Sequence, residues 1–135
     1  GGAPMSSQDR AQVWLAQAED DYETGLLLKE KKFSAAAFFF QQASEKALKA
    51  LALKRHLEYW GHSTLRLLQR IEPNLSADDP RYRCCRRLDF YYIPTRYPDA
   101  FPEGTASEHF GPEDAKEAEA CARTILDWVR KSLAP

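Results

Sequence analysis

Arg96, Tyr97, Pro98 and Asp99 form the short segment of this sequence whose side chains are best suited to binding chemistry. An arginine can hold a phosphate through its planar set of N–H donors, and a tyrosine ring can stack on a nucleobase. The same residues also suit a structural corner, in which Arg96 pairs with Asp99 and Tyr97 fills a gap between helices. The residue types alone leave both interpretations open.

Positive charge gathers in the middle of the chain. Residues 46–96 carry a net charge of +6, whereas residues 1–45 carry −3 and residues 97–135 carry −4, which gives −1 overall. Such a distribution arises either from neutralisation inside a helical bundle or from a face that binds anions. Five cations would form one positive surface if the two helices that carry them are neighbours: Lys46, Lys49, Arg83, Arg86 and Arg87. The alternative is a set of ordinary solvated helix faces.

The histidines and cysteines lack the spacing of a metal site, so we predict no metal and no cofactor. His56, His62 and His109 show no ligand spacing, and no C-x-x-C pair accompanies Cys84 and Cys85. The odd count of three cysteines argues against a disulfide framework, and we expect one of the adjacent pair to pack between helices. His109 is the better candidate for proton transfer, because it lies in a long loop, whereas His62 suits a helix cap. No glycine-rich phosphate-binding fingerprint occurs in the sequence.

The element that must position these residues is a helix over residues 34–55. Apolar residues recur there at three- and four-residue steps, the spacing of one helix face: Phe40, Ala43, Ala47, Leu48 and Leu51. Strong helix formers fill most of the remaining positions. Its polar side, with Gln42, Glu45, Lys46 and Lys49, has the pattern of solvated residues that support a helix through neighbouring charges. We predict that this helix is the centre of a bundle.

Further helices are predicted on both sides of it. The first begins near Ser7 and ends in the lysines of residues 29–32, and the short connection after it predicts an antiparallel hairpin. A shorter helix follows a cap at residues 62–63 and stops at Pro73, a fourth covers about residues 81–92, and the last runs from residues 111–112 to Leu133. Residues 93–111 form the longest irregular segment. The predicted fold class is all-α: an up-and-down antiparallel bundle of four long helices plus one short helix.

Length and composition indicate one domain. A chain of 135 residues with 44 % hydrophobic residues can bury a core, and we assign residues 5–135 to a single helical domain. Residues 1–4, which precede Met5, have the character of an expression scar. No apolar run approaches the roughly 20 residues that span a bilayer, so we predict no membrane partner. No basic-then-apolar signal pattern opens the sequence, and we expect a cytoplasmic protein.

Several of these segments together resemble the HEPN domain, the nucleotide-binding domain of higher eukaryotes and prokaryotes. The resemblance covers nearly all of residues 8–133. It is carried by Trp14-Leu15 with Ala18 and Asp21, by the run from Gln42 to Ala50 (QASEKALKA), by Gly61-His62-Ser63, and by the run from Thr95 to Ala100 (TRYPDA). It places the chain with the prokaryotic members that contain an RYPD-like loop. The polar strip of the central helix is then expected to face that loop or a dimer partner instead of water.

The resemblance implies a five-helix bundle, frequent homodimerisation and, in prokaryotic relatives, a minimal nucleotidyltransferase as partner in toxin–antitoxin or defence systems. It also implies a metal-independent ribonuclease in many members, whose site is an arginine, four to six residues and a histidine. Here Arg96 is followed by twelve residues before His109. Arg55 and His62 have six residues between them, but they span a helix end and a turn, and we interpret that match as coincidence.

Three functional hypotheses follow. The first is a non-catalytic dimer that binds a nucleotide or RNA phosphate, with Arg96, Lys46, Lys49 and Arg87 as anion contacts, Tyr97 as a stacking residue and Asp99 as an orienting partner. The second is a ribonuclease that uses Arg96 with His109, or Arg55 with His62. The third is a structural dimer or adaptor whose contact surface consists of three aromatic residues: Tyr91, Tyr92 and Phe101.

Overall fold

The computed structural model describes residues 5–92 and 104–135, and within these ranges the chain contains helices and no strand. Three helices of 22 residues form the long elements: α1 (Ser7–Leu28), α2 (Phe33–Lys54) and α7 (Pro112–Leu133). Three shorter helices follow α2 and precede α7 along the described parts of the chain: α3 (Thr64–Ile71), α4 (Pro80–Asp89) and the single turn α6 (Ala106–His109). The all-α fold class is confirmed.

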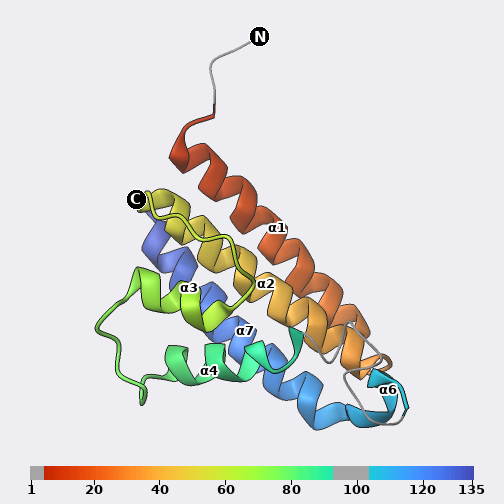
Figure 1. The fold of residues 1–135 in the computed structure, drawn as a ribbon. Coiled ribbons are helices and arrows are strands. Elements are labelled where there is room, and N and C mark those ends of the chain that lie inside the picture. The colour runs from red at the N-terminus through yellow and green to blue at the C-terminus, as the bar shows by residue number, and fades with distance from the viewer. Residues whose placement is uncertain (1–4, 93–103) are drawn as a thin grey trace.

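The central position of α2 is also confirmed. It packs against α1, α7 and α3, and Figure 1 shows α1 and α7 along its two sides. Its largest fully buried side chains are Phe40, Leu48 and Leu51. α1 and α2 run antiparallel. The ends of α2 and α7 lie together, and there Lys54 Nζ donates to the backbone oxygens of Ser132 and Leu133. The core therefore lies between the three long helices.

Local signals in the sequence start most of the helices. The hydroxyl of Ser6 accepts from the amide of the third residue after it at the start of α1, and Ser63 caps α3 in the same way. Asp79 caps α4, whose first residue is a proline, and the amide of Gly111 donates to Asp114 at the start of α7. The predicted starts near residues 7, 63, 79 and 111 are thus confirmed.

α4 is shorter than the predicted segment of residues 81–92. Its last turn tightens, because the amide of Phe90 donates to Arg87 and that of Tyr91 donates to Leu88. The carboxylate of Asp89, the last residue of α4, accepts four hydrogen bonds from the start of α3. The donors are the hydroxyl of Ser63, the amide and hydroxyl of Thr64 and the amide of Leu65. The end of α4 is thereby joined to the start of α3.

The end of α2 carries a residue in an uncommon backbone conformation. His56 has a φ of 58°, in the left-handed region that favours glycine. The amide of His56 donates to Leu53 and that of Leu57 donates to Ala52, which is the hydrogen-bond pattern of a Schellman motif. After it, residues 57–60 run without regular structure back along α2 to the start of α3. None of the helices within the described ranges is long and apolar enough to span a membrane.

Candidate functional site

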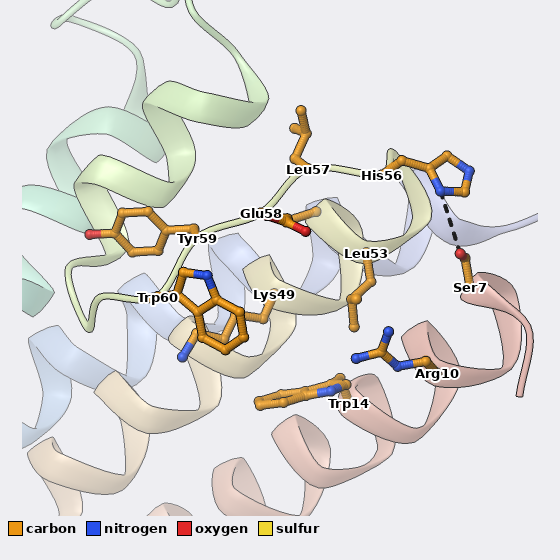
Figure 2. A pocket seen from close by; sticks show the side chains of 11 residues that line it. Ser7, Arg10, Trp14, Lys49, Leu53, His56, Leu57, Glu58, Tyr59 and Trp60 are labelled. Carbon is orange, nitrogen blue, oxygen red and sulfur yellow. Dashed lines mark hydrogen bonds between the residues drawn. The ribbon is translucent and has the colours of Figure 1, made fainter. Parts of the chain in front are cut away.

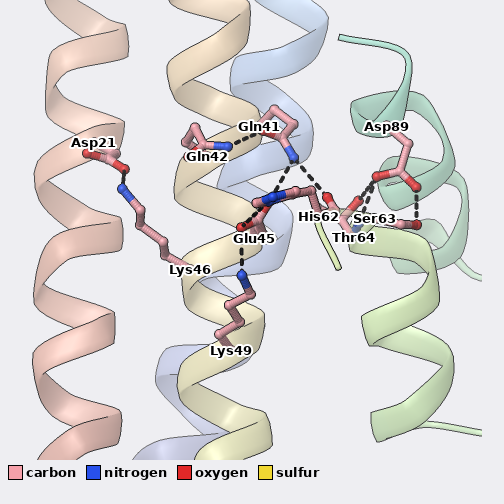
Figure 3. A network of polar contacts seen from close by, with 10 residues as sticks. All are labelled: Asp21, Gln41, Gln42, Glu45, Lys46, Lys49, His62, Ser63, Thr64 and Asp89. Carbon is pink, nitrogen blue, oxygen red and sulfur yellow. Dashed lines mark hydrogen bonds and ion pairs between the residues drawn. The ribbon is translucent and has the colours of Figure 1, made fainter. Parts of the chain in front are cut away.

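The polar side of α2 is largely buried rather than solvated. Gln41 is fully buried and Glu45 is 3 % exposed. The carboxylate of Glu45 accepts from Lys49 Nζ at 2.9 Å and lies 3.3 Å from Nδ1 of His62 (Figure 3). Gln41 donates to Glu45 and to the backbone oxygen of His62. This strip therefore holds the connection before α3 against α2.

Lys46 is part of an ion pair with α1. Its Nζ donates to Asp21 Oδ2 at 2.5 Å (Figure 3). Gln17 donates to the other oxygen of the same carboxylate at 3.0 Å. The side chain of Asp21 is 7 % exposed, so this carboxylate depends on Lys46 for its counter-charge. The contacts of Lys46 are those of a helix-pairing residue.

Arg87 belongs to a different cluster, which joins α4 to α7. Its guanidinium and the hydroxyl of Tyr91 both donate to the carboxylate of Glu117. Burial acts to raise the pKa of Glu117, but these hydrogen bonds outweigh it and hold the pKa below its ordinary value. Burial and the same carboxylate raise the pKa of Tyr91. Lys46 and Arg87 therefore pair with carboxylates on two different helices, α1 and α7, and these contacts do not join them into one cationic surface.

Other predicted residues lie elsewhere or outside the described ranges. Arg96, Tyr97, Asp99 and Phe101 fall within residues 93–103, which the structure does not describe. His109 ends the single turn α6. Arg96 and Asp99 remain predicted contacts on sequence grounds alone.

The structure does not bring Arg55 and His62 together. Arg55 donates to the backbone oxygen of Ile71, the last residue of α3, and lies 3.7 Å from Glu72. His62 precedes the first turn of α3, where it contacts Glu45 and its ring stacks on Tyr92 with centroids 4.9 Å apart. The two residues thus contact opposite ends of α3.

Tyr91 is not a surface residue, which corrects its assignment to a contact surface. It is 3 % exposed, and its ring packs edge-on against Phe110 with centroids 5.7 Å apart. Of the adjacent cysteines, Cys85 is buried between helices and Cys84 is half-buried, as predicted. Within the described residues no group of histidine, cysteine, aspartate or glutamate side chains could hold a metal ion.

An open pocket of about 420 Å³ lies between the first half of α1 and the connection that follows α2 (Figure 2). Its size is within the range of about 300–1,000 Å³ that is typical of small-molecule sites. We name it the α1–α2 pocket, and its lining residues are Ser7, Arg10, Trp14, Lys49, Ala52, Leu53 and residues 56–60.

The α1–α2 pocket combines aromatic rings with cations. Trp60 is 91 % exposed, and Trp14 lies below it in Figure 2. Lys49 Nζ lies over the ring of Trp14, 5.6 Å from its centroid. Arg10 forms no ion pair within residues 5–92 and 104–135. At the same end of the pocket, Nδ1 of His56 lies 3.4 Å from the hydroxyl of Ser7. Trp14 is half-buried, so Trp60 offers the exposed ring of the pocket. An exposed indole beside cations is an arrangement that stacks nucleobases and holds phosphates.

Sequence reasoning missed most of this pocket. The helix pattern places Trp14 on the apolar face of the first helix, and it places Tyr59 and Trp60 only in a turn. The available signal for the pocket is the presence of two adjacent aromatic residues in a short connection. A tryptophan there lies on no apolar helix face, so the helix pattern does not assign it to the core. What the sequence does not show is that the connection returns along α2 and brings Trp60 near Trp14.

Comparisons with known proteins place these features in a family context. Residues 11–132 match the model of the HEPN domain. The crystal structure of TT1696 from Thermus thermophilus is 39 % identical, with a TM-score of 0.85, over 91 % of this chain and 98 % of that chain. ST0689, described as an archaeal HEPN homologue, is 36 % identical, with a TM-score of 0.79, over 93 % and 98 %.

A more distant structure shares the fold. The HEPN domain protein tm0613 from Thermotoga maritima is 24 % identical, with a TM-score of 0.67, over 87 % of this chain and 94 % of that chain. No curated protein matches the chain.

Proposed function

This chain belongs to the HEPN domain family, and from that premise we propose that it is a module that binds a nucleotide or RNA phosphate through the α1–α2 pocket. We further propose that it acts as a homodimer with a minimal nucleotidyltransferase as partner, in a toxin–antitoxin or defence system. The observation that carries the binding function is the meeting of Trp14 and Trp60 with Arg10 and Lys49 around one open cavity.

The chemistry of the pocket matches a nucleotide in two respects. A base has a planar ring that stacks on an indole, and stacking of one base contributes roughly 1–3 kcal/mol in single-strand binding sites. A phosphate takes charge-assisted hydrogen bonds from a guanidinium. Arg10 is exposed on the pocket rim, so its fork of donors is available without breaking an internal contact. The contacts predicted for Arg96, Tyr97 and Asp99 remain a separate part of the proposal that rests on the sequence alone.

The binding test uses calorimetric titration of the whole protein with the 5′-monophosphates of adenosine, guanosine, cytidine and uridine, and with a single-stranded RNA. We expect Arg10→Gln and Trp60→Ala each to weaken binding about tenfold, with binding also weakened by added salt. Arg86→Gln and Phe90→Ala are matched controls, because both residues are exposed on or next to α4, away from the pocket lining. Absence of binding at millimolar nucleotide and RNA would refute the proposal, as would equal losses in the control variants.

The alternative function is that of a metal-independent ribonuclease. The separation of Arg55 from His62 across α3 leaves that pair without a shared site. We expect no cleavage when labelled RNA is incubated with the protein in EDTA. Cleavage that disappears in His109→Ala or His62→Ala would instead identify the chain as an enzyme.

A further inference from the structure

Glu58 is the one carboxylate among the described side chains that line the α1–α2 pocket. It is exposed, and of its oxygens only the backbone one is engaged within the described ranges, where it accepts from Arg70 at 3.4 Å. The carboxylate therefore presents acceptors to whatever enters the pocket. The negative charge of Glu58 repels a phosphate. We therefore expect the ligand group beside Glu58 to be one that donates hydrogen bonds.

The position of Glu58 within the pocket indicates which group this is. His56, Glu58 and Trp60 follow one another at two-residue steps along the connection, which corresponds to about 6–7 Å per step in an extended chain. Arg10 lies toward the His56 end in Figure 2, and Trp14 lies toward the Trp60 end. Along the connection, Arg10, Glu58 and Trp60 thus provide a cation, an acceptor and an aromatic ring in that order, and Lys49 lies over the second ring, that of Trp14. A nucleotide has the same order: phosphate, sugar, base.

We propose, building on the nucleotide-binding function above, that the α1–α2 pocket selects ribonucleotides, and that Glu58 accepts hydrogen bonds from the 2′- and 3′-hydroxyls of the ribose. Two neighbouring hydroxyls can each donate to one oxygen of a carboxylate, whereas a deoxyribose offers one donor or none. A site built to bond a hydroxyl discriminates against the analogue that lacks it, because an acceptor is left without its donor.

The ligand chemistry has two sources, a free ribonucleotide and the 3′ end of an RNA chain. Within an RNA chain only the 3′-terminal ribose presents both hydroxyls, because every internal ribose uses its 3′ oxygen in a phosphodiester. The pocket volume of about 420 Å³ suits one nucleotide unit rather than several. RNA duplexes and internal RNA segments are therefore not the expected ligands.

The test compares the tightest-binding ribonucleoside 5′-monophosphate of the panel above with its 2′-deoxy and 2′,3′-dideoxy analogues, titrated into the full chain. We expect the dideoxy analogue to bind roughly tenfold more weakly than the ribonucleotide, and the 2′-deoxy analogue to be intermediate. In Glu58→Gln the ratio between ribose and dideoxyribose should fall toward one. The ratio is the useful quantity, because removal of a charge changes the affinity of all three phosphates alike.

Glu23→Gln is the matched control, since Glu23 is an exposed glutamate of α1 that does not line the pocket. Equal affinity for the ribose and dideoxyribose forms, or a ratio unchanged by Glu58→Gln, would overturn the ribose assignment while leaving nucleotide binding intact. Failure of all three ligands to bind would instead overturn the function on which it rests. An RNA oligonucleotide with a free 3′ end, compared with the same RNA carrying a 3′-phosphate, then separates the two sources.

Discussion

Gly25 of α1 lies so close to Phe40 of α2 that a β-carbon at position 25 would stand 2.6 Å from a ring carbon. Phe40 is fully buried, and Tyr22 packs edge-on against it with centroids 5.3 Å apart, so a shift of the ring would disturb the packing of the core. Alanine usually stabilises a helix interior by up to about 1 kcal/mol relative to glycine. Here we expect Gly25→Ala to lower the free energy of unfolding by roughly 1–3 kcal/mol, the range of overpacked cores.

Urea denaturation monitored by circular dichroism measures this change. In a Phe40→Leu background the aromatic ring is absent, and the cost of Gly25→Ala should become smaller. A stabilising effect of Gly25→Ala in the unmodified protein would show that the two helices can separate to admit a methyl group.

The ion pair between Asp21 and Lys46 should be a strong contributor to the α1–α2 contact. Lys46→Met leaves the buried carboxylate of Asp21 with Gln17 as its remaining side-chain donor among the described residues, and we expect a loss of roughly 2–3 kcal/mol. Asp21→Asn combined with Lys46→Met should recover part of it, because no unpaired charge is then buried. A double-mutant cycle in urea measures the coupling, and a coupling near zero would contradict the structural role assigned to Lys46.

The fold was predictable from the sequence to the extent that its signals are local. The caps Ser63 and Asp79 lie within a few residues of the helices they start. The burial of Glu45 and the pairing of Lys46 with α1 were not predictable from the helix pattern, because their partners come from distant parts of the chain. Trp60 shows the same limit, since its place beside the pocket depends on the path of the whole connection.

Two substitutions of His56 should separate its effect on stability from its effect on binding. Its left-handed conformation costs a residue with a β-carbon roughly 1 kcal/mol, which glycine does not incur. We therefore expect His56→Gly to be about 1 kcal/mol more stable than His56→Ala, although both lack the imidazole. Both variants should bind nucleotide more weakly than the unmodified protein, by calorimetry. Equal stability of the two variants would show that the backbone there relaxes at no cost.

Glu117 should contribute to the loss of stability in acid. The pKa of its carboxyl is held below the ordinary 4.5 by Arg87 and Tyr91 in the folded protein, so the unfolded chain binds its proton first as the pH falls. Its contribution is fully present above pH 4.5 and is lost as the pH falls through the lower folded value. Because the side chain is 41 % exposed, the effect should be modest and reduced by salt.

Chemical denaturation between about pH 6 and pH 3 tests this expectation. Glu117→Gln should flatten the pH dependence relative to the unmodified protein, while Glu113→Gln, an exposed residue of α7, should leave it unchanged. An identical acid slope in Glu117→Gln would show that other carboxyls, such as the Arg81-paired Asp79, account for the acid sensitivity.

Asp89 accepts four hydrogen bonds from the start of α3, and we therefore expect α3 and α4 to open as a single cooperative unit of local unfolding. The amide protons of Thr64 and Leu65 can exchange with solvent only when the end of α4 releases them, so their exchange rates report on both helices at once. His62, which immediately precedes this junction, would lose its contact with Glu45 in the same opening event.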